Sequence, residues 1–210
     1  MRTVHLVTHP EATHHIDGLV GGWYDSALTP VGRDAAESIA GALRERIPAA
    51  ATVEVHSSDL RRALQTAVTV AARLGVDVRT DPDLREKSYG EAEGRARAWL
   101  DERFVPPPEA GDRLHHDEGI PGSETRWTFA TRAYAALDRI LAGDAEHQVV
   151  VTHGFTATYL IASWIGMPVE SVGFVNFRVT SGGITELRED GFFHNRQLVR
   201  LDDVAHLATH

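Results

Sequence analysis

Apolar residues recur along the chain with two different periods. Short runs rich in β-branched residues occur at 2–8 and 147–152, and residues 52–56 alternate between apolar and polar positions, so we expect strands there. Residues 30–46 and 59–74 repeat apolar side chains at intervals of three and four, which predicts amphipathic helices. Strands that alternate with helices predict an α/β fold of three layers, in which a mostly parallel sheet is covered by helices on both faces.

Residues with known preferences mark the ends of these helices. Thr29 followed by Pro30 predicts an N-cap and a first helical position, and Pro48 ends the first helix. For the second helix we expect the cap in Ser57-Ser58-Asp59 and the end at Gly75.

The second half of the chain continues the same alternation. We expect a short strand near 76–79, helices at about 123–142 and 154–165, and two strands at about 173–179 and 182–188. Ser181-Gly182-Gly183 would join the last two strands, and the tail after residue 190 carries only a weak pattern.

Two segments lack a regular pattern. Residues 9–28 form a long loop with several glycines, and residues 81–122 are charged and contain a triple proline. We interpret 81–122 as an excursion over the active site, with an inserted cap or loop segment near 86–120 and one short helix at about 94–103. Long irregular segments are often functional, so we expect these two to wall a pocket within one domain, 1–210.

A histidine follows directly after each of two predicted strands. His9 follows the strand at 2–8, and His153 follows the strand at 147–152. The carboxyl ends of parallel strands meet at one edge of a sheet, where ligands bind in α/β proteins. A single histidine at such a position is more often a buried core residue, but two at the same edge indicate a shared site.

Charged residues in two other places are candidates for the same pocket, although such residues are usually only solvated. Helix N-termini favour anions, and arginines in a first turn, such as Arg61 and Arg62, can add a bidentate grip on phosphate. Glu86, Glu91 and Glu93 each carry a carboxyl group that can donate a proton to a leaving group. The residues alone do not decide among these three.

Composition narrows the choice of partners. The net charge of −9 and the pI of about 5.7 argue against general nucleic-acid binding but permit a small anionic substrate in a local basic pocket. The absence of cysteine excludes disulfides and thiolate metal sites. No apolar run is long enough to span a bilayer and no signal peptide is recognisable, so we expect a cytoplasmic protein that does not bind membranes. The sequence leaves open whether the protein forms a homodimer, because oligomeric state does not follow from these features.

Five short motifs occur in a fixed order along the chain. They lie at 22–32 (Gly-Trp-Tyr-Asp to Gly32), 57–66 (Ser-Ser-Asp-Leu-Arg-Arg-Ala-Leu-Gln-Thr), 84–94 (Leu-Arg-Glu to Gly94), 121–125 (Pro-Gly-Ser-Glu-Thr) and 152–154 (Thr-His-Gly). Together they resemble the histidine phosphatase superfamily, also called phosphoglycerate-mutase-like, over nearly the whole chain. The resemblance implies a phosphoglycerate-mutase-like fold.

The resemblance also implies a role for each residue at this edge. His9 would be the nucleophile that takes the phosphoryl group and becomes a phosphohistidine. Arg62 and His153 would bind the phosphoryl oxygens, and Glu86 would protonate the departing oxygen. Substrate contacts are implied for six further positions, which are Thr8, His15, Gly21, Gly22, Tyr89 and Gly154. Neither a cofactor nor a metal is implied, because cationic side chains hold the phosphoryl oxygens.

The first motif of the family is altered in this chain. Its Arg-His-Gly corresponds to Thr8-His9-Pro10, and its asparagine corresponds to His15. Thr8 offers one neutral donor in place of a cation, and Pro10 lacks a backbone N–H. Loss of one oxyanion contact typically costs about 10²–10³ in rate, so we expect a weak phosphatase.

Other residues are candidates to restore the positive charge. They are His14, His15, Arg85 and Arg33, and protonated histidines would make activity rise at acidic pH. The histidines also raise the alternative of a metal site, although adjacent histidines such as His14 and His15 rarely point the same way.

Our leading hypothesis is a phosphatase-like hydrolase that acts on a small phosphomonoester through a phosphohistidine at His9. The altered first motif supports an alternative, a divergent member that uses the same pocket for non-phosphoryl acid/base chemistry or for ligand binding. A third hypothesis is an interaction protein that keeps only the fold. A phosphoglycerate-type mutase is less favoured, because the excursion at 95–120 is short for that branch.

Overall fold

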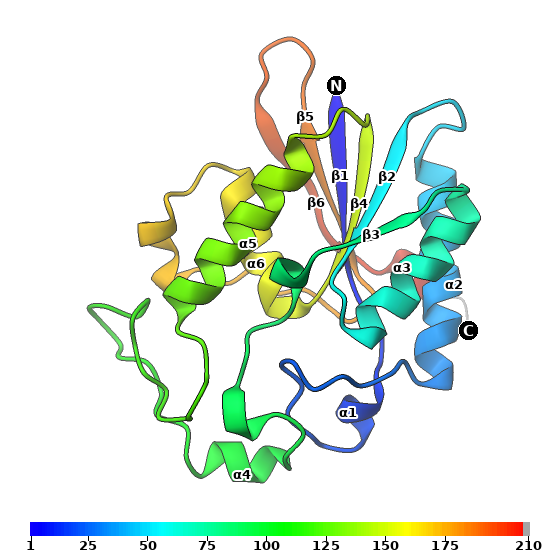
Figure 1. Cartoon of the computed structure of the whole chain (residues 1–210). Helices are drawn as coiled ribbons and strands as arrows, with labels where there is room; N and C mark the ends of the chain where they lie inside the picture. Colours follow the sequence, from blue (N-terminus) through cyan, green and yellow to red (C-terminus); the bar gives the residue numbers. More distant parts are fainter. Residues whose placement is uncertain (208–210) are drawn as a thin grey trace.

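Six strands form one sheet in the computed structural model, which describes residues 1–207. Their order is β3-β2-β4-β1-β5-β6 (Figure 1). The strands are β1 Arg2–Thr8, β2 Val53–Ser57, β3 Val78–Thr80, β4 His147–Thr152, β5 Ile184–Glu189 and β6 Arg196–Asp203. The first four run parallel, whereas β5 is antiparallel to β1 and β6 is antiparallel to β5. The sheet is mostly parallel, as the sequence predicts.

Helices cover both faces of this sheet. The α-helices are α1 Thr13–Ile16, α2 Pro30–Arg46, α3 Arg61–Leu74, α4 Arg97–Asp101, α5 Arg126–Leu141 and α6 Gly154–Trp164. Short 3-10 helices are η1 Pro82–Leu84, η2 Gly90–Ala92, η3 Val169–Phe174 and η4 Ala205–Leu207. α2 and α3 pack on one face, and α5 and α6 pack on the other. The predicted three-layer α/β architecture is confirmed.

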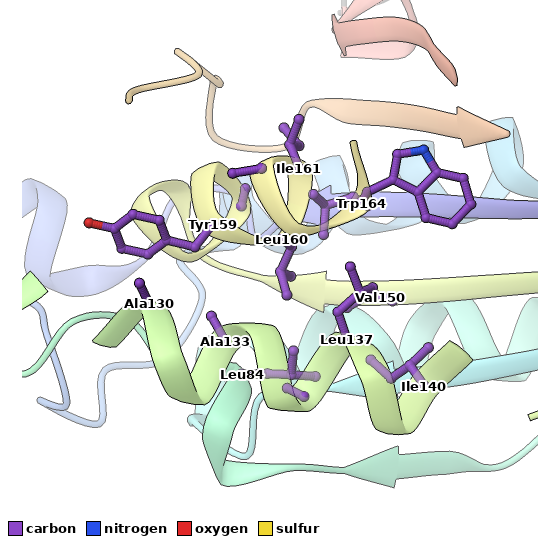
Figure 2. Close-up of a cluster of buried hydrophobic side chains, with 14 of the residues drawn as sticks. Leu84, Ala130, Ala133, Leu137, Ile140, Val150, Tyr159, Leu160, Ile161 and Trp164 are labelled. Atoms are coloured by element: carbon purple, nitrogen blue, oxygen red, sulfur yellow. The ribbon is translucent and has the colours of Figure 1, made fainter. Parts of the chain in front are cut away.

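Alternating side chains of the central strands supply the two cores. Leu6 of β1 and Val150 of β4 point toward α5 and α6, where they join the buried cluster shown in Figure 2. Val7 of β1 and Val151 of β4 point the opposite way, toward α2 and α3. Each fully buried aliphatic side chain contributes about 1.5–3 kcal/mol to folding. The strands are therefore held from both sides, and the loops at their carboxyl ends start from fixed positions.

Most predicted helix ends are confirmed, and one is wrong. Thr29 caps α2 by accepting a hydrogen bond from the backbone N–H of Gly32 (3.0 Å), and Gly75 closes α3 in the left-handed conformation. The N-cap of α3 is Leu60, which makes no side-chain cap, and not Ser57-Ser58-Asp59. Asp25 takes over this task, because its carboxylate accepts from the N–H of Arg61 (2.7 Å).

The prediction for the C-terminal region is wrong in one strand. Residues 169–174 form η3, residues 175–183 lead irregularly to β5, and the partner of β5 is β6, in the weakly patterned tail. The alternation at 173–179 has another cause, since Val175, Phe177 and Val179 pack against the α5–α6 core while the residues between them are exposed. Alternating burial along an extended segment mimics a strand without requiring a sheet partner.

The excursion at 81–122 has a small core of its own. Val20, Ala92, Leu100 and Ile120 are buried together, and Val20 belongs to the loop at 9–28. Backbone hydrogen bonds join the two segments, from Gly94 to Val20 (3.0 Å) and from Val20 to Arg95 (2.9 Å). Figure 1 shows α1, α4 and their loops together at the end of the sheet away from the N-terminus. The predicted short helix is present as α4. None of the helices within residues 1–207 combines the length and apolar character needed to cross a bilayer.

Candidate active site

The carboxyl ends of β1 and β4 bring His9 and His153 together. Thr8 and Thr152 are paired in register as the last residues of these parallel strands, so the histidines that follow them start side by side. The two imidazole rings meet edge to face, with centroids 5.0 Å apart and planes 70° apart. Both histidines are buried. The shared site inferred from the two strand ends therefore exists.

A cavity of about 290 Å³ opens beside these rings. All ten positions that the family resemblance implies line it, and they are Thr8, His9, His15, Gly21, Gly22, Arg62, Glu86, Tyr89, His153 and Gly154. His14, Leu19, Arg97, Val179 and Ser181 complete the lining. The loop at 9–28, the start of α3, the excursion and the start of α6 each contribute to this wall. Of the aromatic side chains in the two irregular segments, Tyr89 lines the cavity, and burial raises the pKa of its hydroxyl far above the usual value.

The contacts of His9 fix which ring nitrogen carries the proton. Nδ1 lies 2.8 Å from the carbonyl oxygen of Pro10, and a carbonyl can only accept, so Nδ1 is the donor. Nε2 is then unprotonated and accepts from Nε of Arg62 (3.2 Å). Burial, and next the charge of Arg62, hold the pKa of His9 well below its ordinary value of 6.5. His9 thus presents a neutral nitrogen lone pair at neutral pH.

Arg62 is held rigidly against this lone pair. It lies at the start of α3 with 1% of its surface exposed. Its two terminal nitrogens donate to the carbonyl oxygens of Tyr24 (2.8 Å) and Gly22 (2.7 Å). Gly22 adopts a φ of +53°, and a Cβ there would lie 2.9 Å from the carboxylate of Glu93, so only glycine fits without strain. Burial lowers the pKa of Arg62 to about 10, which leaves it charged at neutral pH.

His153 is the second imidazole of the site. Its Nε2 lies 2.9 Å from the hydroxyl oxygen of Ser58, and its Nδ1 is buried without a hydrogen-bond partner among residues 1–207. Burial, followed by the charge of Arg62, holds the pKa of His153 well below 6.5, so the ring is neutral. An unpaired buried ring nitrogen typically costs about 1–3 kcal/mol, a cost that a polar ligand in the cavity would remove.

The three acidic residues left open by the sequence occupy different positions relative to the cavity. Glu86 lines the cavity, whereas Glu91 is exposed and Glu93 binds the hydroxyl of Ser88 (2.8 Å) and the backbone of Tyr89 (2.9 Å). The two oxygens of Glu86 accept from the N–H of Lys87 (2.9 Å) and the N–H of Phe155 (3.0 Å). The hydroxyl of Thr156 lies 3.3 Å from Glu86 but donates at shorter distance to the carbonyl of Arg85 (2.9 Å). These bonds hold the carboxyl group at the N-terminus of α6.

A model of the histidine phosphatase superfamily (branch 1) matches residues 4–200. The chain belongs to this superfamily. A relative named "Probable phosphoglycerate mutase GpmB", from Proteus mirabilis, is 30% identical over 209 residues, which are 99% of this chain and 95% of that protein.

Solved structures of phosphatases share the fold with this superfamily member. A mycobacterial glucosyl-3-phosphoglycerate phosphatase, in its complex with VO3, is 26% identical with a TM-score of 0.77, covering 96% of this chain and 99% of that one. The alpha-ribazole phosphatase from Shigella flexneri is 25% identical with a TM-score of 0.76, covering 96% of each chain. The family and fold expected from the motifs are confirmed.

The altered first motif of this superfamily member keeps the orientation of His9 but not the charge. The contact that orients the ring comes from the carbonyl of Pro10, which a proline supplies as well as a glycine does. Thr8 lines the cavity with a neutral hydroxyl. Nδ1 of His15 accepts from the N–H of Ala12 (3.2 Å), so the neutral ring carries its proton on Nε2 and can act as a donor, as an asparagine amide would.

Burial disfavours protonation of His14 and His15, the two histidines expected to replace the missing cation. Burial, and next the neighbouring His15, lower the pKa of His14 to about 3. Burial and Arg62 also lower the pKa of His15. Both rings line the cavity with their centroids 4.0 Å apart, contrary to the expectation that adjacent histidines diverge. Within residues 1–207, no three histidine or carboxylate side chains are grouped so that they could hold a metal ion.

Two of the predicted replacement cations are engaged outside the cavity. Arg85 forms a bidentate ion pair with Asp59 (2.7 and 2.6 Å), and Arg33 donates to the carbonyl of Leu28 (3.1 Å). Besides Arg62, the described residues that line the cavity include one other arginine, Arg97, at the start of α4. Sequence reasoning did not single it out, and its Nε pairs with Asp101 (3.2 Å). The same charged segment contains other arginines, and the sequence gives no reason to prefer Arg97 to them. Only the fold distinguishes Arg97.

Proposed function

We propose that the protein is a metal-independent phosphomonoesterase that transfers a phosphoryl group from a small phosphomonoester to Nε2 of His9 and then to water. The observation that carries this proposal is the state of His9, a buried neutral imidazole whose free lone pair faces a fixed guanidinium in a cavity. Membership of the histidine phosphatase superfamily supports phosphoryl-transfer chemistry.

The first half-reaction moves the phosphoryl group to the protein. Nε2 of His9 attacks phosphorus, the bond from phosphorus to the ester oxygen breaks, and Glu86 gives its proton to that oxygen. The two N–H donors around Glu86 stabilise the carboxylate that remains. In the second half-reaction Glu86 takes a proton from water, the water oxygen attacks phosphorus, and the bond to His9 breaks.

The charge of the transferring group is held by side chains. Arg62 exchanges its bond with His9 for a phosphoryl oxygen, and Nδ1 of His153 donates to another. Arg97 supplies a second guanidinium, in place of the arginine that the first motif lacks, and exchanges its ion pair with Asp101 (3.2 Å) for a phosphoryl oxygen. One donor of this kind is typically worth about 10²–10³ in rate. Because Arg97 is exposed and screened by solvent, its contribution is expected at the low end.

The cavity and the relatives agree on the size of the substrate. A volume of about 290 Å³ admits a phosphoryl group with a small organic remainder. Two phosphatases of similar fold are named for glucosyl-3-phosphoglycerate and alpha-ribazole phosphate, which are small phosphorylated metabolites. We propose the same general class of substrate here.

Hydrolysis of an aryl phosphate tests the proposal directly. His9→Ala should lower kcat/KM by about 10³-fold or more, because a covalent route is removed at its first step. His115→Ala is the control, since His115 is exposed on the excursion and lies outside the cavity lining. Rapid alkaline quenching should trap an alkali-stable, acid-labile phosphoryl group on the wild type and none on His9→Ala. Equal rates for the wild type and His9→Ala would refute the proposal.

The neutral residue at position 8 favours one alternative. Thr8 lies where a fixed cation would grip phosphate, and it leaves Arg62 as the only buried guanidinium that the described lining contains. The alternative is a pocket that binds a less charged ligand or performs acid/base chemistry with His9, His153 and Glu86. The substitution Thr8→Arg distinguishes this alternative from the proposed phosphatase.

A further inference from the structure

A single arginine of α5 holds the main chain that carries Glu86. Nη1 of Arg132 donates to the carbonyl oxygens of Asp83 and Arg85, both at 2.8 Å, and Nη2 donates to the carbonyl oxygen of Glu86 at 2.7 Å. The guanidinium therefore spans the segment that leads from η1 to the proposed acid.

Glu124 completes the arrangement from the other side. Its carboxylate accepts from Nε (2.7 Å) and Nη2 (2.8 Å) of Arg132, and both side chains are only 12% exposed. The same carboxylate accepts from the backbone N–H of Ser88 (2.7 Å). The ion pair thus binds the main chain at Glu86 and on both sides of Glu86 in the sequence.

Every N–H of the Arg132 guanidinium is used in this arrangement. A guanidinium has five N–H groups in a rigid plane, and the five contacts of Arg132 are three carbonyl oxygens and two carboxylate oxygens. Lysine has three donors on one atom and cannot reproduce this fork. Three further side chains donate hydrogen bonds to carbonyl oxygens of the same segment. Thr152 donates to Leu84 (2.7 Å), Thr156 to Arg85 (2.9 Å) and Trp23 to Glu86 (2.7 Å).

We propose that the Arg132–Glu124 ion pair is a positioning device for the acid, which fixes the carboxyl group of Glu86 at the distance from the leaving oxygen that proton transfer requires. This inference rests on the proposed function. Neither Arg132 nor Glu124 belongs to the described cavity lining, so they act through Glu86 and not on the substrate. A displacement of about 1 Å can cost about 10² in rate, and a positioned acid contributes about 10²–10⁴.

The leaving group provides a readout that a purely structural role would not move. Phenolate is a basic leaving group with a pKa near that of tyrosine, about 10, and needs a proton, whereas 2,4-dinitrophenolate is much less basic and does not. We expect Arg132→Lys and Glu124→Gln to lower kcat/KM for phenyl phosphate roughly 10–100-fold. For 2,4-dinitrophenyl phosphate the same variants should stay within about three-fold of the wild type, because the step no longer depends on the acid.

Arg139→Gln is the matched control. Arg139 lies two turns further along α5 and pairs with Asp81 and Asp83 of η1, but it is 51% exposed and does not bind the main chain of Glu86. It should leave both esters unaffected.

Two results would overturn the inference. One is an equal loss on both esters, which would indicate a general structural role, and the other is no loss on either. If circular dichroism shows that Arg132→Lys does not fold, Glu124→Gln decides alone, because it preserves shape and removes only the charge. Failure of the proposed function is recognised separately, by a His9→Ala protein that is as active as the wild type on both esters.

Discussion

The two sides of the cavity are held in different ways. On the nucleophile side, which comprises Thr8, His9, Pro10 and His15, one carbonyl and one guanidinium orient the reactive ring. On the acid side, which comprises Glu86 with its supporting pair Glu124 and Arg132, five N–H groups of one arginine are engaged at once. The side with few contacts is the one whose sequence differs from the family motif.

This difference shows which functions the main chain can perform. A backbone carbonyl orients an imidazole whatever side chain it belongs to, so the change from glycine to Pro10 leaves His9 in place. Positive charge has no main-chain source, so replacing an arginine by Thr8 removes it unless another side chain intervenes. Orientation is therefore preserved on the nucleophile side, while charge must come from elsewhere.

The largest effect is expected on the acid side. Glu86→Gln keeps the shape but cannot release a proton, so kcat/KM for phenyl phosphate should fall about 10²–10⁴-fold, with much less change for 2,4-dinitrophenyl phosphate. Glu91→Gln, at an exposed position of the same segment, should match the wild type. An unchanged rate with phenyl phosphate would mean that Glu86 is not the acid.

Restoring the cation should strengthen the nucleophile side. Thr8→Arg should raise kcat/KM for an aryl phosphate roughly 10–100-fold if one oxyanion contact is all that is missing. Thr8→Val serves as the shape-matched control and should change the rate by less than about five-fold, because it loses only a neutral donor. The gain must vanish in Thr8→Arg combined with His9→Ala. Absence of any gain would favour the alternative in which the pocket has been put to another use.

Removing Arg97 should weaken the nucleophile side further. Arg97→Met should raise KM and lower kcat/KM about ten-fold, because a screened guanidinium acts mainly on binding of the anion. Arg95→Met is the control, since Arg95 stacks on Trp99 (4.5 Å) and donates to Glu91, outside the cavity lining. The loss should shrink in high salt. Equal behaviour of the two variants would exclude Arg97 from the site.

The smallest effect concerns pH. An ordinary histidine becomes protonated below pH 6.5 and would lose its nucleophilic lone pair, but the lowered pKa of His9 moves that loss to more acidic pH. The kcat/KM of the free enzyme for 2,4-dinitrophenyl phosphate should therefore stay nearly flat from pH 7.5 to about 5.5. A ten-fold fall with a midpoint near 6.5 would show that the ring is not buried as described.

The sequence predicts the residues of the site better than it predicts the two C-terminal strands of the sheet. The strand-end histidines follow from periodicity, because a buried parallel strand is a continuous apolar run that stops where the chain turns. The family resemblance favours Arg62 over Arg61, and the structure shows why. Arg62 is buried in the site, while the N–H of Arg61 is bound by Asp25. Ten positions predicted for the site line one cavity.

The features that were missed depend on tertiary contacts. Arg97 and Arg95 are equivalent in sequence terms, and tertiary backbone bonds, among them the one from Arg97 to Gly18 (2.9 Å), set the start of α4 against the cavity. The strand predicted at 173–179 alternates correctly, but its apolar side packs on helices instead of joining the sheet. The N–H of Arg61, at the start of α3, finds an acceptor in Asp25, 36 residues away, so no local pattern could reveal that cap.

The bond between His9 and the carbonyl of Pro10 also has a bearing on how enzymes of this kind are recognised in genomes. A search that insists on the Arg-His-Gly triplet would discard every protein that, like this one, keeps the histidine and its contact with the following carbonyl but lacks the arginine and glycine beside it. A filter built on the histidine, the inward-facing arginine of the following helix and the spacing to the acidic loop would retain them.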